Sequence, residues 1–276
     1  MLTRLAIIGA GAITGEMLAV LGRALAGPLD CLAVLARPGK GDAVAQALGP
    51  AAGTVAADFR VVECVTALIA TKPDLAVEAA GHGAVRDHVP ALLEAGVETA
   101  IASTGALSDP DLAMRLEAAA RAGGTRLVLS SGAVGGMDIL AALSRSDIRS
   151  VTYTSRKPPK AWAGTKAETL VDLDGLAAET VFFEGTARQA SADYPKNANV
   201  AATIALAGAG LERTTVRMIA DPGVNANVHV FDVVSDAAEV SVRIVGKPSP
   251  ANPKTSLPTV YSLVREVMNR VSPIVS

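Results

Sequence analysis

Residues 3–15 read TRLAIIGAGAITG, and this stretch decides the fold of the first half of the chain. It begins as a short apolar run of the kind that forms a buried strand, turns through glycines, and continues into the helical pattern GEMLAVLGRAL. A strand, a glycine-rich turn and a helix in this order are typical of a dinucleotide-binding βαβ unit. In such a unit Gly9 permits the tight turn, and Gly11 lets the backbone approach a pyrophosphate that lies on the helix N-terminus.

The glycine fingerprint of this turn is incomplete. Its third glycine is expected at position 14, where this chain has Thr14, and Gly15 comes one residue late. The first helical residues, Ala12 and Ile13, carry unpaired backbone N–H groups and are expected to face the phosphates. The strand before the turn and the helix after it favour a nucleotide site over a turn without a ligand.

The second strand is expected over 31–36, CLAVLA, and Arg37 follows it. Sites that prefer NAD usually have Asp or Glu at this place, where the carboxylate binds the ribose 2′-hydroxyl. An arginine can instead pair with the 2′-phosphate of NADP, or it can be an exposed loop residue. The sequence therefore predicts that NADP is accepted without excluding NAD, so the expected cofactor is NAD or NADP.

Strands and helices go on alternating as far as residue 131, with one helix expected over 61–70. This alternation predicts an α/β fold with a Rossmann-type, doubly wound parallel sheet. Several of the strands end in small residues, as in Ala79-Ala80-Gly81. Because ligands of open α/β sheets bind beyond the carboxyl ends of the strands, these small residues leave room for a nicotinamide, and Ala80 is an expected cofactor contact.

The pattern changes after the two glycines at 135–136. In the last expected strand, over 239–246, apolar and polar residues alternate, which is typical of an antiparallel sheet with one covered face. We therefore expect a C-terminal α+β domain with a mixed, largely antiparallel open sheet, whose open face meets helices or a partner subunit. Asn197 or Asn199 is expected to cap a helix of this domain.

The chain is thus expected to form two domains. A dinucleotide-binding domain covers 1–133 and is completed by a C-terminal helix within 254–276, and a catalytic and dimerisation domain covers 134–253. The helix carries one apolar stripe, which is expected to pack on the N-terminal domain. Its residues are Val260, Leu263, Val264, Val267, Met268 and Val271.

The stretch 221–231, DPGVNANVHVF, contains His229 at the head of an apolar, β-branched run. An imidazole titrates near neutral pH and can give or take a proton in a reaction. Taken alone, His229 is more simply a half-buried strand histidine without a role. A nucleotide-binding first half with small residues at its strand ends makes His229 a candidate proton carrier beside a hydride transfer, and the family-like segments on both sides of it, described below, reverse the preference. Whether Asp221, Asn225 or Asn227 orients the imidazole stays open on the sequence.

The bulk composition excludes several classes of function. The formal net charge is −2 and aromatic residues make up 3% of the chain, so neither a basic field nor stacking platforms for nucleic acid are expected. No apolar run is long enough to cross a membrane and no targeting signal is recognised, which predicts a cytoplasmic protein. Cys31 and Cys64 are expected to be reduced thiols, and no cysteine or histidine cluster predicts a metal site.

Six groups of segments stand together along the chain: GAGAITG, VEAAGHGAV, STGALSD, SSGAVGGMD, SRKPP with PKNANVAATIALAG, and ADPGVNANVHV with NPKTS. As a set, they resemble the L-aspartate dehydrogenase family over nearly the whole chain, and the C-terminal half carries the specific signal. The resemblance implies a homodimer that oxidises L-aspartate to iminoaspartate with NAD or NADP. The imine then hydrolyses to oxaloacetate and ammonia or feeds nicotinamide-nucleotide biosynthesis.

The resemblance also implies roles for single residues. His229 is the expected catalytic residue, and Ala133 and Asn199 are expected to contact the nicotinamide end of the cofactor. The substrate dicarboxylate needs cations or hydroxyl donors, and each cation can equally be a solvated surface residue. The candidates are Lys196, Lys254, Arg156, Thr255 and Ser256.

Two other functions stay open on the sequence alone. A related two-domain dehydrogenase acting on another amino acid or a semialdehyde has the same fold, but it does not explain the NVHV and NPKTS segments. A nucleotide-binding sensor without chemistry needs neither His229 nor the lysine-containing loops of the second half.

Overall fold

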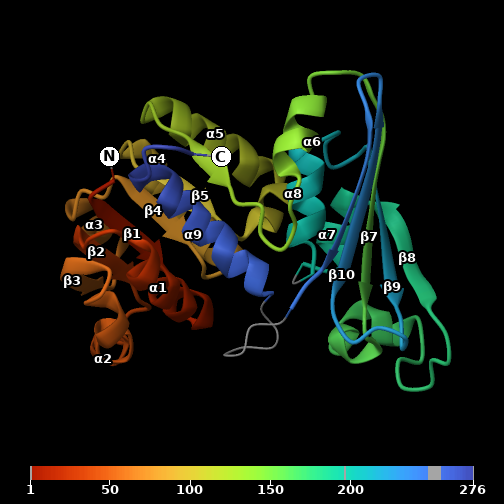
Figure 1. The fold of residues 1–276 in the computed structure, drawn as a ribbon, viewed down its shortest axis with the longest axis horizontal. Helices are drawn as coiled ribbons and strands as arrows, with labels where there is room; N and C mark the ends of the chain where they lie inside the picture. Colours follow the sequence, from red (N-terminus) through yellow and green to blue (C-terminus); the bar gives the residue numbers. More distant parts are fainter. Residues whose placement is uncertain (1, 196, 248–255, 276) are drawn as a thin grey trace. The chain divides into compact units, whose positions relative to one another are not determined.

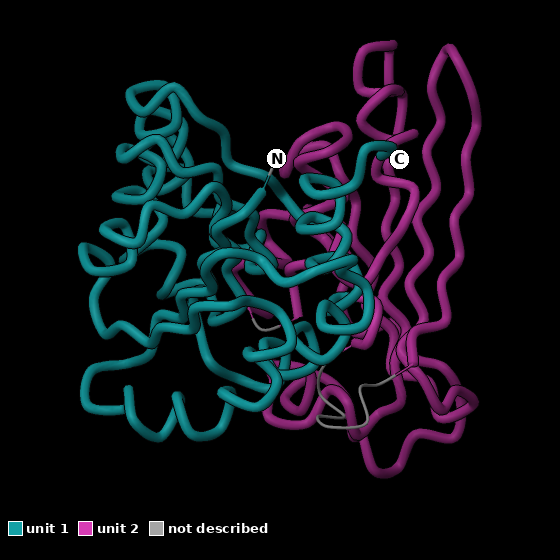
Figure 2. The backbone as a smooth tube through the Cα atoms, turned by 60° about the vertical axis from the view of Figure 1, so that its left-hand side comes forward, with its two compact units in different colours: residues 1–130, 259–276 teal, residues 131–258 magenta. Residues whose placement is uncertain are grey.

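The computed structural model describes residues 2–195, 197–247 and 256–275. The chain forms two compact units, one of residues 1–130 together with 259–276 and one of residues 131–258 (Figure 2). The polypeptide therefore leaves the first unit, builds the second, and returns to the first.

Unit 1 contains a six-stranded sheet in the order β3-β2-β1-β4-β5-β6, and all of its paired strands are parallel. The strands are β1 (Arg4–Ile8), β2 (Leu29–Leu35), β3 (Ala56–Val62), β4 (Leu75–Glu78), β5 (Glu98–Ile101) and β6 (Leu127–Leu129). The order reverses between β1 and β4, which is the switch point where doubly wound sheets bind ligands. The predicted Rossmann-type sheet is confirmed.

Helices cover both faces of this sheet (Figure 1). They are α1 (Ala12–Ala24), α2 (Gly41–Ala52), α3 (Val65–Ala70), α4 (His82–Glu94), α5 (Pro110–Ala122) and α9 (Leu257–Val271), with a short 3-10 helix η1 (Thr104–Ser108). Side chains alternate along β1, so Leu5 and Ile7 pack against α1, α2 and α9, whereas Ala6 and Ile8 pack against α3, α4 and α5. The apolar stripe of α9 thus completes one of the two cores of unit 1.

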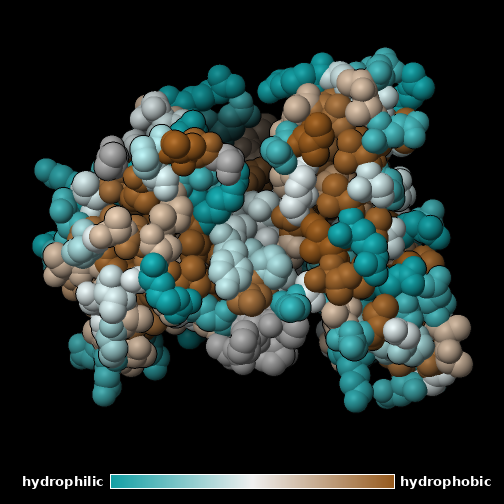
Figure 3. All heavy atoms as spheres, viewed as in Figure 1, coloured by the Kyte–Doolittle hydropathy of each residue, from teal (hydrophilic) through white to brown (hydrophobic). Residues whose placement is uncertain are grey.

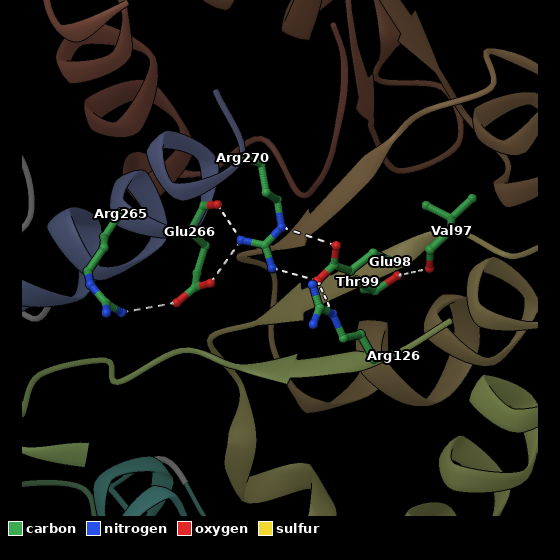
Figure 4. A network of polar contacts seen from close by, with 7 residues as sticks. All are labelled: Val97, Glu98, Thr99, Arg126, Arg265, Glu266 and Arg270. Atoms are coloured by element: carbon green, nitrogen blue, oxygen red, sulfur yellow. Dashed lines mark hydrogen bonds and ion pairs between the residues drawn. The ribbon is translucent and has the colours of Figure 1, made fainter. Parts of the chain in front are cut away.

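A polar network also fixes α9 to the sheet (Figure 4). Arg270 near the end of α9 pairs with Glu98 of β5 at 2.7 Å and with Glu266 one helical turn earlier at 3.0 Å, and Arg126 pairs with Glu98 at 2.8 Å. Burial opposes the charge of Glu98, but the guanidiniums of Arg270 and Arg126 outweigh it and lower the pKa of this carboxyl.

Unit 2 contains a five-stranded sheet in the order β11-β10-β7-β9-β8. Its strands are β7 (Ile148–Lys157), β8 (Thr180–Thr186), β9 (Thr214–Ala220), β10 (Val228–Ser235) and β11 (Glu239–Val245). β7 and β9 are parallel and the other pairs are antiparallel, which confirms the predicted mixed sheet.

One face of this sheet is covered by the helices α6 (Met137–Leu143), α7 (Ala187–Asp193) and α8 (Asn199–Ala207) and by the 3-10 helices η2 (Pro159–Trp162) and η3 (Lys166–Thr169). Val240, Val242 and Ile244 of β11 pack into the core on this face, as their alternation predicts. The opposite face is open and bears mainly polar residues. Figure 3 shows hydrophobic residues on the α6 and α8 side of the unit and hydrophilic ones toward β8.

Two local expectations are wrong. The helix expected from residue 61 begins at Val65, because the β-branched Val61 and Val62 pair with Val34 and Leu35 and finish β3 instead. The helix α8 begins at Asn199 after Ala198 as N-cap, without a side-chain cap. Across 2–195, 197–247 and 256–275, no helix combines the length and apolar character that crossing a bilayer requires.

Candidate active site

The turn after β1 has the geometry of a phosphate-binding turn. Gly9 has φ +103°, a backbone conformation that side chains disfavour, and a Cβ there would come within 2.8 Å of Ala80 Cβ. A Cβ on Gly11 would meet nothing within 4 Å, and Gly11 is the N-cap of α1 with no side chain bound over it. The N–H groups of Ala12 and Ile13 at this helix end therefore fit a dinucleotide pyrophosphate.

Thr14 does not disturb this turn. Its side chain is fully buried, and its hydroxyl donates to the Gly9 carbonyl at 2.8 Å. This hydrogen bond links the first turn of α1 to Gly9, so the residue in the third-glycine position stabilises the turn.

Glu78 is a site residue that the sequence reasoning missed. This carboxylate is completely buried at the end of β4 and accepts hydrogen bonds from the N–H groups of Ala80 and Gly81, both at 2.6 Å, and of Ser103 at 3.1 Å. The Ser103 hydroxyl donates a further bond at 3.0 Å. Glu78 therefore joins the turns that follow β4 and β5. An acidic residue inside the apolar run DLAVEAA was the available signal.

Arg37 lies exposed just after β2, in a turn closed by Lys40 N–H to the Arg37 carbonyl at 3.0 Å. Glu63, at the end of the neighbouring strand β3, reaches into the same turn and accepts from Gly41 N–H at 2.6 Å. The N–H groups of Gly39, Gly41 and Lys40 lower the pKa of Glu63. Glu63 therefore supplies a carboxylate beside the turn that follows β2, although Glu63 itself follows β3.

His229 lies on β10, on the helix-covered face of the unit 2 sheet. It stands opposite Ser155 of β7 and is only 4% exposed. Its Nδ1 is 2.7 Å from the hydroxyl of Tyr153, and the two rings are stacked with an angle of 17° between their planes. The predicted orienting residues Asp221, Asn225 and Asn227 do not form this contact, so Tyr153 is the residue that fixes the imidazole.

Lys157 is the second residue missed by the sequence reasoning, which gave it no role. It ends β7, is 7% exposed, donates to Asn197 Oδ1 at 2.8 Å, and lies 4.5 Å above the centre of the Trp162 ring. Burial lowers the pKa of Lys157 to about 8. No carboxylate within the described ranges forms an ion pair with it.

Burial, and secondly the nearby Lys157 cation, lower the pKa of His229 to about 4. The imidazole is therefore neutral at physiological pH. Burial also raises the pKa of Tyr153, which keeps its hydroxyl protonated. A hydroxyl can accept from Nδ1–H, and in that tautomer the Nε2 lone pair of His229 is free to take a proton.

The remaining predicted residues are spread over unit 2. Ala133 is buried in the turn before α6, and Asn199 opens α8. Ser256 lies beside Gly246 at the end of β11, and its buried hydroxyl has no hydrogen-bond partner among the described residues. Lys196, Lys254 and Thr255 lie outside the described residues.

Arg156 and Asp221 bind one another at 2.9 Å. Arg156 also pairs with Glu179, and Asp221 accepts from Gly223 N–H at 2.7 Å. Arg156 therefore already has carboxylate partners, which makes it a weaker candidate for a substrate anion than Lys157. Among the described residues, no group of three or more His, Cys, Asp or Glu side chains is arranged to hold a metal ion.

Each of the two units is similar to part of a known protein family. Residues 9–130 match the model of the homoserine dehydrogenase NAD-binding domain, and residues 138–270 match the model of the aspartate dehydrogenase C-terminal region. An L-aspartate dehydrogenase of Cupriavidus necator is 53% identical over 199 residues, which cover 72% of this chain and 75% of that protein. One of Ruegeria pomeroyi is 44% identical over 97% of this chain and 92% of its own.

A solved structure shares the whole architecture. The crystal structure of aspartate dehydrogenase from Thermotoga maritima superposes with a TM-score of 0.74 at 25% identity, covering 100% of this chain and 99% of that chain. The likeness therefore extends over both units.

Proposed function

Because the chain belongs to the L-aspartate dehydrogenase family, we propose that it oxidises L-aspartate to iminoaspartate with NAD or NADP, and that the imine hydrolyses to oxaloacetate and ammonia. The observation that carries this proposal is the neutral, buried His229, oriented by Tyr153 and placed on the same sheet face as Lys157. A proton carrier of this kind is what an amine oxidation needs beside the hydride transfer.

The substrate amine must be neutral before an imine can form, so a base has to remove its proton. His229 does this through Nε2 while Nδ1–H donates to the Tyr153 oxygen. Once it has released this proton to solvent, the neutral Nε2 can accept a proton from the water that attacks the imine carbon. The bound dinucleotide supplies the hydride acceptor.

The proposed cofactor residues come from several segments of the chain. Gly9, Gly11, Ala12 and Ile13 hold the pyrophosphate, supported by the turn at Ala80 that Glu78 fixes. Ala133 and Asn199 contact the nicotinamide end, as the family resemblance implies. The substrate carboxylates bind in unit 2. The predicted contacts for them are Ser256, Lys196, Lys254 and Thr255.

The decisive experiment is aspartate-dependent reduction of NAD and of NADP by the purified protein, followed at 340 nm. Replacement of His229 with Ala is expected to lower kcat by about 10² or more with nucleotide affinity unchanged. Near-normal turnover by this variant removes His229 from the mechanism. A screen of other amino acids and semialdehydes separates a related dehydrogenase, and nucleotide binding without any reduction identifies a sensor.

We also propose a homodimer that uses the open face of the unit 2 sheet. Val181 and Val245, large apolar residues that are 42% and 50% exposed, lie on this face and stand across from Ile219 and Val228 of the neighbouring strands. Thr154 lies near its middle on β7, and Thr154→Arg is expected to convert the dimer to a monomer in light scattering. A wild-type monomer contradicts the proposal.

We further propose that the enzyme works in the cytoplasm, in a pathway that uses iminoaspartate for nicotinamide-nucleotide synthesis. The two cysteines, Cys31 and Cys64, are both free thiols, which suits a reducing compartment. Cell fractionation tests the location, and trapping of the imine by a downstream synthase, compared with oxaloacetate release, tests the pathway.

A further inference from the structure

The ammonium group of Lys157 is a buried cation without a counter-ion in the described part of the chain. Its partners are a neutral amide oxygen, Asn197 Oδ1, and the face of Trp162. Buried charges in proteins are ordinarily paired, because an isolated charge in a low-dielectric interior is unfavourable. The contrast with Arg156, one residue earlier, is clear, since that side chain is bound by two carboxylates.

The position of Lys157 relative to His229 follows from strand register. His229 lies opposite Ser155, and Lys157 is two residues further along β7, so both side chains stand on the same face of adjacent strands. The charge of Lys157 acts on the imidazole strongly enough to contribute to its lowered pKa. An anion bound by Lys157 therefore lies next to the proton carrier.

We propose that Lys157 binds a carboxylate of the substrate and thereby positions the amine against His229. An ammonium has three donors, of which Asn197 takes one, so donors remain for a carboxylate. The proposal rests on the function proposed above, because it assigns part of the substrate site of that reaction.

The test is binding of succinate, a dicarboxylate without a reactive amine, measured by calorimetry with nucleotide present. Lys157→Met is expected to weaken succinate binding about 10- to 100-fold, the effect of losing one charge-assisted hydrogen bond. In kinetics the same variant is expected to raise the KM for L-aspartate by a similar factor, while the dissociation constant of the nucleotide is unchanged. Lys157→Arg is expected to restore part of the succinate affinity.

Lys160→Met is the matched control, because Lys160 lies three residues away and is exposed. Unchanged succinate affinity in Lys157→Met overturns the assignment, and so does an equal loss in the control. The binding measurement is independent of turnover. If wild type binds succinate through Lys157 but does not oxidise aspartate, the proposed reaction fails while the carboxylate site stands.

A separate observation concerns the choice of nucleotide. β2 and β3 pair in parallel with Leu35 beside Val62, so Glu63 extends from β3 next to the turn that contains Arg37. Its carboxylate binds Gly41 N–H at the start of α2, and a Cβ on Gly41 would come within 2.9 Å of Glu63 Oε1. The backbone donors of this turn are thus already directed at a fixed negative charge.

We infer that Glu63 disfavours the 2′-phosphate of NADP and makes NAD the preferred nucleotide despite Arg37. NADP differs from NAD by a phosphate of about two negative charges, which is repelled by a carboxylate that binds this turn from the neighbouring strand. The acid that usually ends β2 in NAD sites is here supplied by the neighbouring strand.

Fluorescence titration of NADH and NADPH with the purified enzyme tests this inference without turnover. Wild type is expected to bind NADH more tightly, and Glu63→Gln is expected to lower the dissociation constant of NADPH about tenfold relative to NADH. Asp58→Asn removes an exposed charge from the same strand and is expected to leave the ratio unchanged. A wild-type preference for NADPH, or an unchanged ratio in Glu63→Gln, overturns the inference.

Discussion

Holding an unpaired lysine in the interior of unit 2 should make the free enzyme less stable than it could be. Burial lowers the pKa of Lys157 from 10.5 to about 8. The unfolded chain holds this proton up to the higher value, so between the two values the unfolded state binds more protons and the free energy of unfolding rises with pH. At pH 7 the full penalty is present, and it is on the order of 3 kcal/mol.

Lys157→Met removes the charge and keeps an apolar stem of similar length. Removing the buried charge stabilises the folded state by about 3 kcal/mol. The variant also loses the cation–π contact with Trp162 and leaves an Asn197 oxygen without its donor, which together cost about 2 kcal/mol. The variant is therefore expected to be more stable than wild type by about 1 kcal/mol at pH 7, with the gain shrinking toward pH 10 as the wild-type lysine loses its proton.

Trp162 is the single tryptophan of the chain and lies directly beneath Lys157, so its fluorescence reports unfolding of unit 2. Guanidinium denaturation of wild type, Lys157→Met and the exposed control Lys160→Met gives the comparison. A Lys157→Met variant that is less stable than wild type by 1 kcal/mol or more refutes the reasoning, because Lys157 then contributes to folding rather than opposing it.

Three further predictions concern residues around the two sites. Tyr153→Phe removes the group that fixes the His229 tautomer and should lower kcat about tenfold with little change in the KM for aspartate, as steady-state kinetics will show. In Lys157→Met the pKa of His229 should rise from about 4, because the repelling cation is gone while burial remains, so the acidic limb of the pH–rate profile should move to higher pH; an unmoved limb contradicts this. Arg270→Met should destabilise unit 1 by about 2 kcal/mol, a difference that shrinks as pH falls below 4.5 and Glu98 is protonated in both proteins, with the exposed Arg265→Met as control in thermal unfolding.

The sequence was most informative where local pattern and tertiary structure agree. The glycines after the first strand, the alternation of strands and helices, and the period-two pattern of 239–246 all correspond to observed elements. Val61 and Val62 were misassigned because a helical apolar spacing continues through them, and only their pairing with β2 makes them strand residues.

The candidate site was only partly predictable. His229 could be found because the nucleotide-binding first half and the family-like segments around it outweigh the plain reading of a lone strand histidine. Its partner Tyr153 lies 76 residues away and is brought to it by β7–β10 register. Lys157 precedes two prolines and therefore resembled a loop residue. The lowered pKa of Lys157 arises from burial in unit 2 beside Trp162. No local sequence pattern indicates that burial. Glu63 likewise follows β3 but binds the turn that follows β2, and this contact depends on how the two strands pair.

The return of α9 to unit 1 has a consequence for biosynthesis. Val260, Leu263, Val264 and Val267 fill a core whose other members come from the first half of the chain. During translation the nucleotide-binding unit therefore emerges first but completes its core last, after the whole of unit 2 has left the ribosome. Until α9 has emerged, unit 1 exposes an apolar surface that chaperones can recognise.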